Sequence, residues 1–122
     1  MKIEDVLVRI YAPLEYIEDE IYFYEKFTGE KANNRFSYRE KSFKLEIVRV
    51  GGFLIIAGSE EDLKDFRATS ATIRGDSLEE VKGFVLSNGG KVIKDIKDVP
   101  TGQNMTLEHK DGTIIEYVHH NK

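Results

Sequence analysis

The most constraining feature of the sequence is an order of predicted elements that occurs twice. Apolar residues that alternate along the chain predict strands, and apolar residues three or four positions apart predict helices. In the first half these patterns predict a strand, a helix and three strands, at 6–11, 15–28, 35–38, 43–50 and 53–57. In the second half they predict the same order, at 67–74, 78–87, 92–95, 104–109 and 113–119. Each half is therefore a predicted βαβββ unit.

A shift of 60 residues aligns the glycines of the two halves. It places Gly29 on Gly89, where the predicted helices end, and Gly52 on Gly112, in predicted hairpin turns. Glycines at the same structural position in both halves indicate a duplication. A unit of about 60 residues buries too little apolar surface to be stable alone. We therefore expect one domain spanning 1–122, with repeat one at 3–58, an acidic linker at 59–66 and repeat two at 67–119.

The doubled unit predicts a fold class. A four-stranded sheet with a helix on one face leaves its other face free. We expect an α+β fold in which two tandem βαβββ units form a curved eight-stranded mixed sheet, a cup with the helices on the outer face. A cup of this kind encloses space for a small ligand.

Charge and composition exclude several kinds of partner. The chain has 18 Lys and Arg against 22 Asp and Glu, so a nucleic-acid-binding role is not expected. The longest apolar run, at 53–57, is far shorter than the roughly 20 residues of a membrane-spanning helix. The chain has no cysteine and begins without the pattern of a signal peptide. We therefore predict a cytoplasmic protein without a nucleic-acid or membrane partner.

Three segments carry a resemblance to a known family. They are FYEK at 23–26 followed by Gly29, IRGDSLEEV at 73–81, and DGTIIEY at 111–117. With these motifs in this order and the doubled topology, the chain resembles the vicinal oxygen chelate superfamily over essentially its whole length. This superfamily includes glyoxalases, bleomycin-resistance proteins and extradiol dioxygenases. The resemblance implies the cup fold and a small-molecule site inside the cup.

The resemblance also implies four positions for the ligands of a divalent metal ion. In this chain they are occupied by Asp5, Ile56, Ala68 and Glu116. Glu116 is a ligand type that the family uses, and Asp5 has oxygen atoms, but Ile56 and Ala68 offer no donor. Two protein oxygens make a weak site, because metal centres normally take three or more protein ligands. We expect no cofactor; if a divalent metal binds, its ligands are Asp5 and Glu116.

The histidines do not complete this metal site. His119 and His120 are adjacent, so on a strand their side chains point to opposite faces. His109 precedes the Asp111-Gly112 turn, and we interpret it as an ordinary exposed polar residue. A role for His109 at the mouth of the cup is the less favoured alternative.

Glu116 is the best candidate for a catalytic residue. Its carboxylate interrupts an apolar strand, and a buried carboxylate needs a partner. The predicted partner is Arg9, which shares the polar face of the first strand with Tyr11 and would make the cup a receptor for an anion. The candidate ligand-binding residues are Arg9, Tyr11, Ser70, Thr72, Asn104 and Glu116. The alternatives are a solvated Glu116 and a surface salt bridge of Arg9.

Three functions are compatible with these patterns. We favour a glyoxalase- or bleomycin-resistance-like protein that binds a small polar or aromatic organic molecule in the cup as a homodimer, without the full metal site. The alternative is a divalent-metal-dependent lyase, isomerase or dioxygenase of the glyoxalase type. The third is a homodimeric module without a ligand, whose cup is filled by side chains such as Phe36, Tyr38 and Phe43. The sequence does not name the ligand or decide whether a reaction is catalysed.

Overall fold

The structure is a computed structural model that describes residues 1–40 and 43–121. The chain divides into two compact units. The N-terminal unit is Val8–Ala68, and the C-terminal unit is Met1–Leu7 together with the chain from Thr69 onward. Strand β1 (Ile3–Pro13) contributes to both, because its first residues belong to the C-terminal unit and the remainder to the N-terminal unit.

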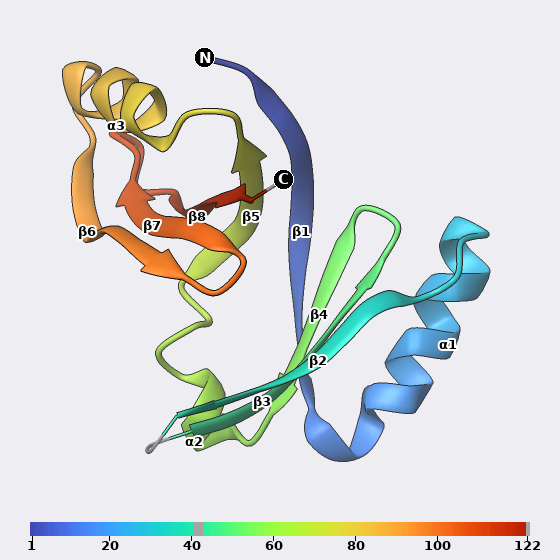
Figure 1. The fold of residues 1–122 in the computed structure, drawn as a ribbon. Coiled ribbons are helices and arrows are strands. Elements are labelled where there is room, and N and C mark those ends of the chain that lie inside the picture. Colours follow the sequence, from blue (N-terminus) through green and yellow to red (C-terminus); the bar gives the residue numbers. More distant parts are fainter. Residues whose placement is uncertain (41–42, 122) are drawn as a thin grey trace. The chain divides into compact units, whose positions relative to one another are not determined.

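The N-terminal unit contains one mixed sheet and two helices (Figure 1). After β1 and a 3-10 turn at Leu14–Tyr16, its elements are α1 (Ile17–Thr28), β2 (Asn33–Glu40), β3 (Phe43–Val50), β4 (Phe53–Gly58) and α2 (Glu60–Leu63). The strand order is β2-β3-β4-β1. Strand β1 is parallel to β4, whereas β4 is antiparallel to β3 and β3 to β2.

Helix α1 covers one face of this sheet. It ends at Gly29, whose φ of 75° is a left-handed conformation that glycine adopts without steric cost. Its buried residues Ile17 and Ile21 are one helical turn apart and pack on Val48 and Ile55 of the sheet. This packing forms one core of the N-terminal unit.

The opposite face of the same sheet is covered as well, although the sequence predicts a free face. Leu45 and Ile56 are 1% and 2% exposed and pack against Leu63 of α2. Phe43 lies against Tyr38 with ring centroids 5.4 Å apart and meets the edge of the Phe66 ring at 5.1 Å. The segment predicted as an acidic linker thus includes helix α2, and this helix supplies a second core.

The C-terminal unit contains a mixed sheet and one longer helix. Its elements after residues 1–7 are β5 (Thr69–Gly75), α3 (Leu78–Ser87), β6 (Lys91–Val99), β7 (Gly102–Glu108) and β8 (Ile114–His120). The strand order is β5-β8-β7-β6, with β5 parallel to β8 and the other pairs antiparallel. Residues 1–7 join this unit at Lys2, whose N–H donates to the Asp76 carboxylate at 2.8 Å.

Helix α3 covers one face of the C-terminal sheet. Ser77 caps its N-terminus, because the Ser77 hydroxyl accepts a hydrogen bond from the Glu80 N–H. Leu78, Val81 and Val85 are buried and pack on residues of β7 and β8. Phe84 does not belong to this buried core, and its side chain is 56% exposed.

The predicted fold class is confirmed. Both halves have the βαβββ order, the eight strands are of mixed direction, and α1 and α3 each cover one face of their sheet. The ends of the observed strands differ from the predicted ends by a few residues. None of the helices in the described ranges is both long and apolar enough to cross a membrane.

Candidate functional site

Polar side chains lie in one row across the C-terminal sheet. The strand register places Thr106 of β7 opposite Glu116 of β8, and Glu116 opposite Thr72 of β5. Alternate residues of a strand point to opposite faces, so Ile115 and Tyr117 turn toward the core under α3 and Glu116 turns away from it. We call the surface formed by Thr72, Thr106 and Glu116 the Glu116 face.

A threonine hydroxyl orients the Glu116 carboxylate. Thr72 Oγ1 donates a hydrogen bond to Glu116 Oε1 at 3.3 Å. Thr72 is 6% exposed, and Glu116 is half-buried rather than exposed. Two carboxylate oxygens have several lone pairs, so the hydrogen bond from Thr72 is compatible with a further hydrogen bond from a ligand.

A β-bulge changes which residue of β5 joins this face. The register between β5 and β8 shifts between Thr69 and Ala71, and the intervening Ser70 is exposed. Thr69, which is 8% exposed, lies opposite Ile114 on the side of Glu116. Sequence reasoning named Ser70 and missed Thr69, because alternation alone does not reveal a bulge.

Asn104 lies two residues before Thr106 on β7 and is half-buried. It is opposite Val118 of β8, which is two residues after Glu116. By strand alternation Asn104 therefore shares the Glu116 face. The strand begins at Gly102, two residues before its predicted start, so Asn104 lies inside the strand.

Arg9 and Tyr11 belong to the N-terminal unit. Arg9 Nη1 donates to the Tyr11 hydroxyl at 3.1 Å, and this hydroxyl donates in turn to the carbonyl of Phe66. The Arg67 guanidinium lies 5.7 Å from the centre of the Tyr11 ring. Tyr11 thus anchors the segment that follows α2. Arg9 and Glu116 are in different units, and their pairing remains a prediction.

A second arginine shares the face of Arg9. The register places Arg9 opposite Leu54, and Leu54 opposite Arg49. Arg49 Nε donates to the carbonyl of Gly51 at 2.9 Å. Sequence reasoning missed Arg49, because this neighbourhood depends on the order β1-β4-β3 and on the register of both strand pairs.

The positions implied for a divalent metal do not fit the family's metal centre. Ile56 belongs to the apolar cluster around Leu45 and is 2% exposed, and Ala68 has no donor atom. Within residues 1–40 and 43–121, no group of three or more His, Asp and Glu side chains is arranged to hold a metal ion. Asp5 and Glu116 belong to the C-terminal unit, whereas Ile56 and Ala68 belong to the N-terminal unit.

His109 is not an ordinary exposed residue, and that prediction is wrong. It is half-buried, and its Nε2 lies 2.5 Å from the Tyr117 hydroxyl oxygen, with the two rings stacked at 6.1 Å between centroids. Burial raises the pKa of Tyr117, which is 4% exposed, above its ordinary value of 10. The hydroxyl is therefore neutral at physiological pH.

We expect Tyr117 to ionise at a higher pH than an ordinary tyrosine, because its pKa is raised by burial. Burial disfavours the ionised form of Tyr117, so the neutral hydroxyl contributes to the stability of the folded protein. This contribution is complete below the pKa of tyrosine in the unfolded state, about 10, and is lost as the pH rises through the higher pKa of the folded state. Tyr24 also has a raised pKa, first through burial. Ultraviolet titration should show late-ionising tyrosines, one of which disappears in Tyr117→Phe. If the tyrosine absorbance change at the highest pH values has the same size in Tyr117→Phe as in the wild type, this assignment is contradicted.

Comparison with known proteins identifies relatives among solved structures. No family model matches the chain, and no curated protein matches it. An uncharacterised protein from Methanosarcina mazei is 41% identical with a TM-score of 0.87, and the match covers 100% of this chain and 96% of that one. The chain belongs to the same family as this protein. Family membership does not assign a function, because that relative is itself uncharacterised.

More distant structures show the fold alone. Methylmalonyl-CoA epimerase from Mycobacterium tuberculosis is 16% identical with a TM-score of 0.64, over 98% of this chain and 88% of that one. A variant of Streptomyces coelicolor methylmalonyl-CoA epimerase, in complex with 2-nitronate-propionyl-CoA, is 13% identical with a TM-score of 0.68, over 99% and 100%. The Methanosarcina mazei family thus has the vicinal-oxygen-chelate-like fold that the sequence motifs predict.

Proposed function

We propose that this protein belongs to the vicinal oxygen chelate superfamily and binds a small polar or aromatic organic molecule at the Glu116 face, without the superfamily's full metal centre. The observation that carries the proposal is the half-buried Glu116 carboxylate, held by Thr72 Oγ1 at 3.3 Å on the sheet face opposite α3. The likeness in fold to a methylmalonyl-CoA epimerase in complex with 2-nitronate-propionyl-CoA supports it, because an organic ligand binds to a protein of this fold.

The chemistry of the Glu116 face favours a ligand with hydrogen-bond donors. The Glu116 carboxylate accepts hydrogen bonds, and the hydroxyl of Thr106 on the neighbouring strand both donates and accepts. A hydroxyl, amide or amine of a ligand would meet Glu116, while Thr106 and Asn104 supply further polar contacts. A hydrogen bond to a charged group is stronger than a neutral one, so Glu116 should dominate the affinity.

Glu116 is also our candidate for a catalytic residue. A carboxylate within hydrogen-bond reach of a ligand can accept a proton as a general base. Thr72 would act as a positioning residue, because its hydroxyl fixes the orientation of that carboxylate. The roles of Arg9 and Tyr11 in binding, the homodimer, the cytoplasmic location and the repeat boundaries remain predictions.

We expect Glu116→Gln to weaken ligand binding about 10- to 100-fold. The amide keeps the size of the side chain but removes its charge, and a hydrogen bond to a charged group contributes about 1.5–3 kcal/mol. A screen of small polar and aromatic compounds by thermal shift on the wild type supplies the ligand. Titration calorimetry then compares the dissociation constants of this ligand for the wild type and for Glu116→Gln.

The matched control for this experiment is Glu61→Gln. The Glu61 side chain is 78% exposed on α2 and pairs only with Lys64 three residues away among the contacts described for it. This variant should bind the compound as the wild type does. Equal binding by Glu116→Gln, or a screen without any stabilising compound, would count against the proposal.

The competing function is a metal-dependent lyase, isomerase or dioxygenase. It predicts stoichiometric Zn, Ni, Mn or Fe in protein purified without a chelator, and loss of that metal in Glu116→Ala. The donor atoms at the four implied positions favour the metal-free protein instead, because Ile56 and Ala68 have none. Elemental analysis of both proteins distinguishes the two functions.

A further inference from the structure

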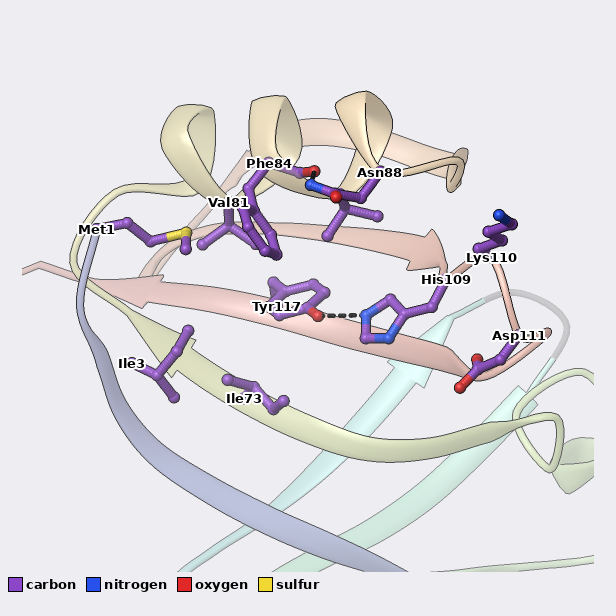
Figure 2. A pocket seen from close by; sticks show the side chains of 11 residues that line it. Met1, Ile3, Ile73, Val81, Phe84, Asn88, His109, Lys110, Asp111 and Tyr117 are labelled. Atoms are coloured by element: carbon purple, nitrogen blue, oxygen red, sulfur yellow. Dashed lines mark hydrogen bonds between the residues drawn. The ribbon is translucent and has the colours of Figure 1, made fainter.

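A separate cavity lies in the C-terminal unit between α3 and its sheet, on the side of the sheet away from the Glu116 face. It has a volume of about 400 Å³. Figure 2 shows the side chains of Met1 and Ile3, together with side chains from α3, β5 and β8, around it. Its apolar lining residues are Met1, Ile3, Ile73, Val81, Phe84 and Val85. A volume of this size is within the range of cavities that bind small organic molecules.

Several apolar side chains of this cavity are open to solvent. Met1, Ile3 and Phe84 are 56%, 43% and 56% exposed. Phe84 points from α3 toward the cavity, and the Tyr117 ring lies below it on β8 (Figure 2). An apolar occupant would remove these side chains from water, which is favourable in proportion to the area covered. An aromatic ring suits the cavity, since Phe84 and Tyr117 both present rings to it.

The cavity has a hydrogen-bonding pair at one end. His109 Nε2 and the Tyr117 hydroxyl oxygen are 2.5 Å apart and both residues line the cavity (Figure 2). If Tyr117 donates to His109, the Tyr117 oxygen still accepts, and His109 Nδ1 carries the proton. If His109 donates to Tyr117, the hydroxyl proton of Tyr117 is available to another acceptor. In either tautomer the pair has hydrogen-bonding capacity for one more hydroxyl group.

The charges at this end favour a neutral ligand. Lys110 and Asp111 follow His109 and also line the cavity. The Thr113 N–H donates to the Asp111 carboxylate at 2.9 Å and holds the pKa of Asp111 below its ordinary value, so this carboxylate is ionised at neutral pH. One cation and one anion give no net charge at the cavity's polar end.

The cavity is not a general consequence of the βαβββ architecture. The residue of the first repeat that aligns with Phe84, 60 residues earlier, is Tyr24. Its ring contacts Phe53 at 4.7 Å and Phe27 at 6.4 Å between centroids. Aromatic rings thus occupy the space beside α1, whereas the space beside α3 is open.

We propose that the cavity under α3 is a second binding site, for a small neutral aromatic alcohol of the phenol class. The ring contacts Phe84 and the apolar residues around it, and the hydroxyl bonds to the pair of His109 and Tyr117. The Glu116 face has no part in this site, so the inference goes beyond the proposed function and stands or falls separately from it.

The test is a ¹⁹F NMR titration with 4-fluorophenol as the probe. The wild type should show saturable binding with a dissociation constant of about 1 mM or lower, a normal affinity for a ligand of so few atoms. Fluorobenzene, which lacks the hydroxyl, should bind about tenfold more weakly. Binding of 4-fluorophenol that is kept in Glu116→Gln and lost in Ile3→Trp belongs to this cavity and not to the Glu116 face.

Two variants locate the binding. His109→Phe should reduce the affinity for 4-fluorophenol about tenfold and leave fluorobenzene binding unchanged. Ile3→Trp places a larger side chain in the cavity and should therefore abolish binding. Because Ile3 is 43% exposed, this variant should remain folded. Circular dichroism and thermal melting confirm that both variants are folded. If His109→Phe does not fold, Ile3→Trp still decides the question.

Two results would overturn the proposal. One is the absence of saturable binding to the wild type, and the other is equal binding by wild type and Ile3→Trp. If the wild type does not bind and Ile3→Trp converts a dimer to a monomer in sedimentation, the cavity is instead a contact with a second copy of the chain.

Discussion

Replacing Gly102 by alanine is expected to lower the free energy of unfolding by more than about 3 kcal/mol. Gly102 begins β7 opposite His120, with a φ of 148° that side-chain-bearing residues rarely adopt. A Cβ added there would lie 1.9 Å from the carbonyl oxygen of His119 and 2.9 Å from its carbonyl carbon. Both atoms are backbone, so the clash is relieved only if the pairing of β7 with β8 is disturbed.

The control is Gly83→Ala, measured with Gly102→Ala by chemical denaturation. Gly83 lies inside α3, and a Cβ added there meets no atom within 4 Å. Alanine in a helix interior is more favourable than glycine by about 0.5–1 kcal/mol, so this variant should be slightly more stable. A loss below about 1 kcal/mol in Gly102→Ala would contradict the β7–β8 register, and with it the alignment of Thr106 with Glu116.

The second large effect is expected for Leu45→Ala, with a loss of about 2–5 kcal/mol in the free energy of unfolding. Leu45 is 1% exposed and packs with Ile56 and Leu63 on the sheet face opposite α1. Truncation removes buried methyl groups and leaves a cavity that α2 does not fill. If this face were free, as the sequence predicts, Leu45 would be partly exposed and the loss would be small.

The matched comparison is Leu86→Ala. Leu86 lies on α3 and is 39% exposed, so the same truncation should cost about 1 kcal/mol or less. Denaturation of both variants under the same conditions gives the difference. Similar losses for the two would mean that α2 and Leu63 do not cover Leu45 in solution.

The fold was predictable because its signals are local. Helix α3 begins at the Ser77 cap and α1 ends at Gly29 with a left-handed backbone, as the residue types at these positions predict. Alternating apolar residues identify the strands of both halves without knowledge of their partners. Helix α2 was missed, because four residues with three acids and Leu63 are too short to show a helical period.

The candidate site was predictable only in part. Glu116 and Thr72 were both named, and the register places them opposite each other with a hydrogen bond between them. Thr69 and Arg49 were missed because a bulge and two strand registers decide which face they join. The pair of His109 and Tyr117 joins residues on either side of a hairpin turn, and residue types alone do not reveal their contact.

The claim on which the proposed function depends is that a ligand binds at the Glu116 face. The most direct measurement is a crystal structure of the protein with a stabilising compound from the ligand screen. We predict a polar atom of that compound at about 3 Å from a Glu116 carboxylate oxygen, with Thr72 still bonded to the carboxylate. A compound bound elsewhere, with the Glu116 carboxylate in contact with water alone, would contradict the claim.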